Sequence, residues 1–240
     1  MGLETLSRWQ RPHGIVMPND FIQLADETGI LLSINRQLML EACQQLRAWH
    51  QLFTSDPPLS LSINISPRQF AQEDFALQIG QVLQECGVDP HCVNLEITES
   101  IAMSNVERSQ AVLTQLRALG VGLDIDDFCT GYSSLSRLQG FPVDTLKIDR
   151  AFVSRIDSNR ETHEIVRIIV ILAHNLGLKV TAEGVETQAQ LDLLRRMDCE
   201  QAQGYLFSKP ADTQTIEKLL AAKRAGIAPA TQARATAAST

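Results

Sequence analysis

Short strand-like runs alternate with longer helical segments along most of this 240-residue chain. This alternation is typical of parallel βα units, because each helix returns the chain so that the next strand can join the same sheet. The predicted strands span residues 2–9, 59–64, 93–97, 121–126, 145–149, 178–183 and 202–206. The predicted helices span residues 34–49, 75–85, 106–119, 165–176, 188–197 and 215–223. The pattern therefore predicts an α/β fold built from repeated βα units.

A closed (β/α)₈ barrel needs eight strands, and this sequence starts almost inside its first predicted strand. We therefore expect a modified (β/α)₈ barrel of the TIM type that lacks one strand at its N-terminus. Residues 1–224 are predicted to form this domain. Residues 225–240 are rich in Ala, Thr and Pro without apolar periodicity, which predicts a disordered tail or a linker.

Composition narrows the classes of function. The formal net charge of −7 argues against a long nucleic acid as partner, since binding a phosphate backbone calls for clustered Lys and Arg. The five cysteines form no CxxC pair, and the N-terminus does not resemble a signal peptide. The apolar runs are shorter than the roughly 20 residues of a membrane span. We predict a reduced, cytoplasmic protein, or the cytoplasmic part of a larger membrane-bound protein, and no membrane contact by this segment.

Polar residues recur on one face of the predicted strands. Side chains alternate between the two faces of a strand, and in each central strand the apolar set occupies one face and a polar set the other. The polar residues at the carboxyl ends of these strands are Asn64, Glu96, Asp126, Asp149 and Glu183. Barrel enzymes place their chemistry at this end of the strands.

Several carboxylates at one end of a barrel repel one another unless cations neutralise them. Oxygen donors without a His or Cys set indicate a hard cation such as Mg²⁺ or Mn²⁺. Simpler interpretations exist for single positions: Asp126 and Asp127 as helix caps, Glu96 and Glu99 as a capping arrangement, or Lys147 with Asp149 as a structural ion pair. A shared metal site explains all the polar strand ends together.

Seven motifs in order resemble the EAL-domain family of cyclic dinucleotide phosphodiesterases. The matching segments are Glu4-Thr5-Leu6-Ser7-Arg8-Trp9, Asn64-Ile65-Ser66, Glu96-Ile97-Thr98-Glu99-Ser100, Asp126-Asp127-Phe128-Cys129-Thr130-Gly131-Tyr132-Ser133-Ser134, Lys147-Ile148-Asp149-Arg150, Ala182-Glu183-Gly184-Val185-Glu186-Thr187 and Gln203-Gly204-Tyr205.

The resemblance implies that two Mg²⁺ or Mn²⁺ ions hydrolyse cyclic di-GMP to linear pGpG. It assigns the metal ligands Glu4, Asn64, Glu96, Asp126, Asp127 and Glu183, with Asp126 as the bridge. It assigns catalytic roles to Lys147, Glu183, Asp149 and Gln203, and substrate contacts to Arg8, Leu6, Asp149 and Gln203. Two metals can activate a shared water and stabilise the attacking and leaving oxygens.

The resemblance also implies a loop that responds to metal, substrate and dimerisation. This loop comprises Phe128, Cys129, Thr130, Gly131, Tyr132 and Ser133, with Glu99 as its anchor and Glu186 as outer support. The expected partners are cyclic di-GMP, a second copy of the chain, and an upstream sensory or GGDEF-type domain in a longer parent protein.

Three departures from the family pattern bear on activity. Thr5 stands where the family has Ala, Cys129 stands where it has Gly, and the first strand with its Tyr-Gln-Pro-type motif is absent. An alternative function is therefore a weak or inactive EAL domain that acts as a cyclic di-GMP receptor or a protein-interaction module. A barrel hydrolase for another phosphoester fits the metal site but not the seven motifs.

Overall fold

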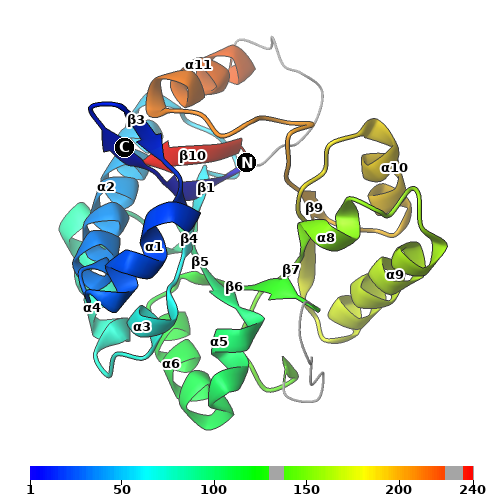
Figure 1. Ribbon diagram of the computed structural model, residues 1–240, viewed down its shortest axis with the longest axis horizontal. Coiled ribbons are helices and arrows are strands. Elements are labelled where there is room, and N and C mark those ends of the chain that lie inside the picture. Colours follow the sequence, from blue (N-terminus) through cyan, green and yellow to red (C-terminus); the bar gives the residue numbers. More distant parts are fainter. Residues whose placement is uncertain (130–137, 225–234, 240) are drawn as a thin grey trace. The chain divides into compact units, whose positions relative to one another are not determined.

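The computed structural model describes residues 1–129, 138–224 and 235–239 (Figure 1). The chain forms two compact units. The first unit contains residues 1–93 together with the described part of 210–240, and the second contains residues 94–209 apart from 130–137. Within the described residues, no helix is both long enough and apolar enough to cross a membrane.

The first unit contains a parallel sheet in the order β10-β1-β4 and an antiparallel hairpin of β2 and β3. Its strands are β1 (Gly2–Ser7), β2 (Trp9–Arg11), β3 (Gly14–Val16), β4 (Ser60–Asn64) and β10 (Ala235–Ser239). Its helices are α1 (Pro18–Glu27), α2 (Leu31–Leu52), α3 (Pro67–Phe70), α4 (Phe75–Cys86) and α11 (Thr213–Arg224), with a 3₁₀ turn η1 at Pro90–Cys92.

The core of this unit lies where α2 meets β4 and α4. Helix α2 buries Cys43, Leu46 and Trp49, which are at most 1% exposed. Strand β4 buries Leu61 at 1% exposure, and its next residue, Ser62, points to the other face and is also buried. The polar inward face of the strand is thus held in place by a well-packed apolar face.

The second unit contains a parallel sheet in the order β5-β6-β7-β8-β9. Its strands are β5 (Val93–Thr98), β6 (Gly122–Phe128), β7 (Thr145–Ile148), β8 (Lys179–Ala182) and β9 (Gln201–Ala202). Its helices are α5 (Glu99–Ser104), α6 (Val106–Ala118), α8 (Arg150–Val153), α9 (Arg160–Asn175) and α10 (Gln188–Arg196).

Apolar residues of these strands form a continuous buried layer. Leu95, Leu123, Leu146 and Val180 are each 0% exposed. The alternate residues of the same strands point to the opposite face, as the alternation of apolar and polar residues in the sequence predicts. This register directs the acidic residues and Lys147 to one side of the sheet.

Two strands end at least two residues before the predicted position. The strand predicted at residues 202–206 is only Gln201–Ala202, because the chain turns at Gly204, which has φ +151°. A Cβ at Gly204 would lie 2.3 Å from the backbone nitrogen and oxygen of Val185, so only glycine fits there. The strand predicted at residues 2–9 ends at Ser7, and Trp9 belongs to the hairpin.

Helix α1 and the β2–β3 hairpin were not predicted. The helix had a readable signal, since Pro18 stands in its first turn and Asp20 follows. Of the predicted tail, residues 225–234 and 240 lie outside the described residues, whereas Ala235–Ser239 form β10. Strand β10 pairs in parallel with β1, with Glu4 opposite Thr236.

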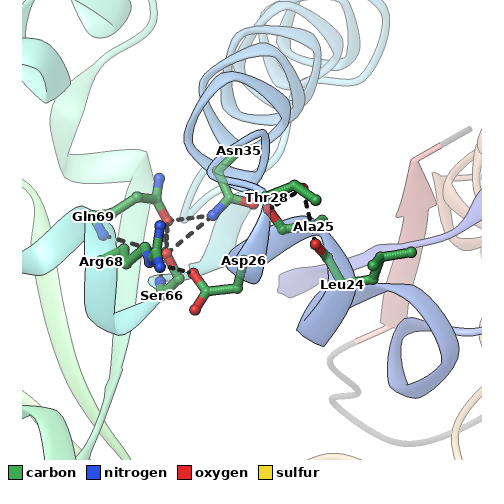
Figure 2. A network of polar contacts seen from close by, with 8 residues as sticks. All are labelled: Leu24, Ala25, Asp26, Thr28, Asn35, Ser66, Arg68 and Gln69. Carbon is green, nitrogen blue, oxygen red and sulfur yellow. Dashed lines mark hydrogen bonds and ion pairs between the residues drawn. The ribbon is translucent and has the colours of Figure 1, made fainter.

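A capping box begins the short helix α3 directly after β4. The Ser66 hydroxyl accepts a hydrogen bond from the backbone nitrogen of Gln69, and the Gln69 side chain accepts one from the backbone nitrogen of Ser66. The Asn35 amide of α2 also donates to Ser66 Oγ at 3.1 Å (Figure 2). A polar network therefore fixes the segment that follows Asn64.

Replacing Ser66 with alanine is expected to lower the free energy of unfolding by about 1 kcal/mol, because the cap and the Asn35 contact are both lost. Urea unfolding followed by circular dichroism measures this change. Ser55 is exposed in a loop of the same unit, and Ser55→Ala serves as the control, with an expected change below about 0.5 kcal/mol. Equal effects of the two substitutions would contradict the role given to the network.

Candidate metal and active site

A buried cluster of carboxylates surrounds Lys147 in the second unit. Lys147 Nζ lies 2.6 Å from Glu96 Oε2, 2.5 Å from Glu183 Oε1 and 3.5 Å from Asp126 Oδ1. The Lys147 and Glu96 side chains are both 0% exposed. Four residues from four neighbouring strands or strand ends thus meet at one point.

Asp126 and Asp127 lie at an irregularity of the sheet. The register between β6 and β7 shifts between Ile125 and Phe128, and Asp127 has a positive φ of 54°. Such a bulge adds a residue to one strand and redirects the side chains beside it. The Asp127 backbone nitrogen donates to Asp126 Oδ1 at 2.9 Å, which fixes the orientation of that carboxylate.

Burial dominates the electrostatics of both aspartates. It raises the pKa of Asp126, and the Glu96 and Asp127 carboxylates raise it further, whereas Lys147 lowers it. Burial also raises the pKa of Asp127, followed by the neighbouring Asp149 carboxylate. One ammonium among this many carboxylates leaves an excess of negative charge in a poorly hydrated place.

Asp149 and Gln203 contribute hydrogen bonds around this cluster. The Gln203 amide donates to Glu183 Oε1 at 2.8 Å, so it holds the carboxylate that Lys147 also contacts. Asp149 Oδ1 accepts from the backbone nitrogen of Ala151 at 2.7 Å and so begins helix α8. The isolated Lys147–Asp149 ion pair considered from the sequence is therefore too simple an interpretation, since Lys147 contacts three other carboxylates.

The first unit brings Glu4 and Asn64 together. Asn64 Nδ2 donates to Glu4 Oε1 at 3.0 Å, and Glu4 is 7% exposed on β1. Leu6 is half-buried on the same strand. Arg8 directly follows the last residue of β1, and its guanidinium donates a hydrogen bond to the Ser7 carbonyl oxygen at 2.8 Å.

The segment after β6 begins in a strained conformation. Phe128 is 1% exposed, and Cys129 has a positive φ of 68°. The backbone nitrogen of Cys129 donates to Glu99 Oε2 at 3.1 Å, and Glu99 is itself buried. The predicted loop residues Thr130, Gly131, Tyr132 and Ser133 lie outside the described residues.

Cys129→Gly is expected to preserve or raise stability, whereas Cys129→Val is expected to lower the free energy of unfolding by about 1–2 kcal/mol. A β-branched residue is disfavoured at positive φ, and glycine is not. Urea unfolding of the two variants beside the parent chain measures the difference. Equal stability of the glycine and valine variants would show that this backbone conformation is not maintained in solution.

The second unit has two further acidic residues of interest, Glu186 and Asp124. Glu186 Oε1 pairs with Arg150 at 3.1 Å, and both side chains are about half exposed or more. Arg150 also packs against Gly184, where a Cβ would meet it at 2.3 Å. Asp124 was not among the predicted site residues. Asp124 is 2% exposed. It stands two residues before Asp126, so the two side chains lie on the same face of β6, and this spacing could have identified it from the sequence.

The donor set suits a hard cation. Among the described residues, no group of three or more His, Cys, Asp and Glu side chains is arranged to hold a metal ion. Here the Lys147 ammonium lies between the carboxylates and supplies the positive charge. The chemistry of the donors still fits Mg²⁺ or Mn²⁺, because buried carboxylate oxygens with excess negative charge are the ligands these ions prefer.

The EAL domain family matches residues 1–210, and so includes every predicted metal ligand, the whole second unit and most of the first. The chain belongs to the EAL domain family. The Bifunctional diguanylate cyclase/cyclic di-GMP phosphodiesterase MucR of Pseudomonas aeruginosa is 40% identical over 217 residues. That similarity covers 90% of this chain and 31% of MucR, so the chain spans less than a third of this curated relative.

Two solved structures establish the fold class. The PaMucR phosphodiesterase in its c-di-GMP complex has a TM-score of 0.80 at 39% identity, covering 84% of this chain and 81% of that chain. The manganese/cy-diGMP complex of Klebsiella pneumoniae BlrP1 has a TM-score of 0.63 at 31% identity, covering 72% of this chain and 44% of that chain. The predicted modified (β/α)₈ barrel is thus confirmed as the fold class of this EAL domain.

Proposed function

We propose that this EAL domain hydrolyses cyclic di-GMP to linear pGpG and so lowers the level of this second messenger. The observation that carries the proposal is the cluster of Glu96, Asp126 and Glu183 around Lys147. All four residues belong to the EAL motifs of this chain. The cyclic di-GMP complex of the PaMucR phosphodiesterase supports the choice of substrate.

Divalent cations are part of this proposal. Glu4, Asn64, Glu96 and Asp126 would hold one ion, and Asp126, Asp127 and Glu183 would hold the other, as the motif match assigns them. When bound, the ions would lower the pKa of water and neutralise charge on the phosphate. The manganese complex of BlrP1 supports Mn²⁺, and the all-oxygen donor set suits Mg²⁺ equally.

The side chains of the chain itself would position the reacting groups. Lys147 would donate a hydrogen bond to the attacking water and orient it, with Glu183, Asp149 and Gln203 fixing Lys147 and the water in place while the water passes its proton to a carboxylate of the cluster. The water oxygen forms a bond to phosphorus, the bond from phosphorus to the 3′ oxygen breaks, and the 3′ oxygen takes a proton. Arg8 would bind a phosphate oxygen through its planar guanidinium, beside Leu6.

Incubating the chain with cyclic di-GMP and Mg²⁺ or Mn²⁺, followed by chromatography, tests the proposal. We expect pGpG as the product with either ion and none in excess EDTA. Calorimetric binding of cyclic di-GMP by a folded, metal-loaded sample without any product would instead support the receptor alternative. Turnover of an unrelated phosphodiester but not of cyclic di-GMP would support the third alternative.

We also propose that the domain forms a homodimer through helix α9. Ile165, Ile168 and Ile171 form an exposed apolar stripe on this helix, at 41%, 57% and 47% exposure. Two copies can pair these stripes across a twofold axis, because each residue then meets an equivalent surface.

Ile168→Glu is expected to shift the chain from dimer to monomer, because it places a charge at the centre of the stripe. Light scattering after size-exclusion chromatography measures the molar mass, and Glu161→Gln serves as a control that leaves the stripe intact. An unchanged mass for Ile168→Glu would exclude α9 as the dimer interface.

The length of MucR supports a further part of the proposal. This chain spans 31% of that relative. In a longer parent protein, a sensory or GGDEF-type domain would regulate the EAL domain. We propose a cytoplasmic location, where cyclic di-GMP acts as a second messenger.

A further inference from the structure

A cavity of about 320 Å³ lies within the first unit, between α2, α3 and α4. It has an apolar floor and a polar rim. Its floor includes Met39, Phe75, Ile79 and Val82, which are at most 4% exposed. Its rim includes Ser33, Arg36, Gln69, Gln72 and Gln78. A cavity of this size is at the lower end of the range of small-molecule sites, about 300–1,000 Å³, which combine apolar walls with a few polar groups.

The Gln69 side chain is fixed so that its amide nitrogen is available to this cavity. Its Oε1 accepts hydrogen bonds from Asn35 Nδ2 at 2.8 Å, the Ser66 backbone nitrogen at 3.0 Å and Ser66 Oγ at 3.0 Å. Three donors at one atom determine which end of the amide is the oxygen. Figure 2 shows the oxygen turned toward Asn35 and Ser66, and among the described residues the amide nitrogen has no hydrogen-bond partner.

Gln69 as a whole is only 6% exposed, but its amide nitrogen is not among the fully buried polar atoms of the described residues, so this N–H donor is open to the space of the cavity that Gln69 lines. Such a donor at a cavity wall can hydrogen-bond water or a ligand. Arg36 adds a positive charge at the rim. Arg36 forms an ion pair with Glu85 at 3.4 Å, and both side chains are about half exposed. This pair uses one guanidinium nitrogen, so other guanidinium N–H groups remain for a ligand.

We propose that this cavity binds a small organic carboxylate with an apolar body. The carboxylate would accept hydrogen bonds from the Gln69 amide nitrogen and from Arg36, and the apolar body would pack on Phe75 and Ile79. Charge-assisted hydrogen bonds of this kind are stronger than neutral ones, and apolar contact supplies the remaining affinity. The site is separate from the proposed hydrolase activity and does not depend on it.

The same contacts connect the cavity to a predicted metal ligand. Gln69 holds the backbone of Ser66, which stands two residues after Asn64, and Asn64 donates to Glu4 at 3.0 Å. A ligand that hydrogen-bonds Gln69 therefore acts on the segment that positions Asn64. Binding is expected to change the resonance of the Asn64 side-chain amide as well as those of Asn35 and Ser66.

Titrating the full chain with sodium benzoate, followed by ¹H–¹⁵N spectra, tests the site. We expect saturable shifts at Asn35, Ser66 and Gln69 at up to millimolar benzoate, and much weaker ones with benzylamine, whose cation is repelled by Arg36 and cannot accept from the Gln69 amide nitrogen. Gln69→Glu keeps the oxygen that caps α3 but replaces the amide nitrogen with a negative oxygen. It is expected to weaken benzoate binding about tenfold or more.

Gln44→Glu is the matched control, because it adds the same charge on the exposed surface of α2, away from the residues that line the cavity. It is expected to leave benzoate binding unchanged. If Gln69→Glu does not fold, Arg36→Gln replaces it, with the same expected loss. Absence of shifts at millimolar benzoate, equal binding of benzylamine, or unchanged binding by the rim variant would each overturn the proposal.

Discussion

Replacing Lys147 with methionine is expected to lower the free energy of unfolding by about 3–5 kcal/mol in the absence of divalent metal, because the buried carboxylates lose their ammonium partner. Glu96 is most affected, since its side chain is 0% exposed and lies 2.6 Å from Lys147 Nζ. Methionine keeps most of the side-chain volume, so the change reports mainly on charge. Urea unfolding in EDTA measures it.

Two further variants show whether charge is the cause. Lys179 is exposed at the start of β8, and Lys179→Met is expected to change the unfolding free energy by less than about 0.5 kcal/mol. Adding Glu96→Gln to Lys147→Met is expected to recover part of the loss, because it removes an uncompensated buried charge. A Lys147→Met variant as stable as the parent chain would contradict the role assigned to the ammonium.

Asp126→Asn is expected to reduce turnover of cyclic di-GMP about 10³-fold while leaving the fold intact. The proposal makes Asp126 a ligand of both metal ions, and losing several kcal/mol of transition-state stabilisation corresponds to a loss of this size. Stability should not fall, because burial raises the pKa of Asp126. A raised pKa means that folding disfavours the charged form at neutral pH, and asparagine lacks that charge.

The paired measurement is turnover of cyclic di-GMP beside urea unfolding of the same samples. Asp192→Asn, on the exposed surface of α10, serves as the control and is expected to leave both quantities unchanged. Retention of a tenth or more of the parent turnover by Asp126→Asn would contradict the assignment of Asp126 as the shared ligand.

Most of the site prediction came from the alternation of side chains along the strands. Alternation placed Glu96, Asp126, Lys147 and Glu183 on one face or at its carboxyl end, and the structure brings these side chains together. Such a prediction needs only the period of a strand and the common direction of parallel strands. It could not show that Lys147 lies among the carboxylates, since side-chain reach depends on the packing of several strands.

Features that depend on single backbone angles were not predictable. The bulge at Asp127 and the turn at Gly204 arise from local φ values and from contact with Val185, which a hydrophobic pattern does not encode. The contact of Asn35 with Ser66 and Gln69 joins residues more than 30 positions apart. Nothing in the local sequence of α2 indicates that contact, although Ser66 and Gln69 alone have capping-box spacing.

The most direct test of the proposed function is a single-turnover reaction of the metal-loaded chain with cyclic di-GMP in ¹⁸O-labelled water, analysed by mass spectrometry. We expect pGpG as the only product, with one water-derived oxygen on its terminal 5′ phosphate. The absence of linear product from a folded, metal-loaded sample, or a linear product without the label, would contradict hydrolysis of cyclic di-GMP by this EAL domain.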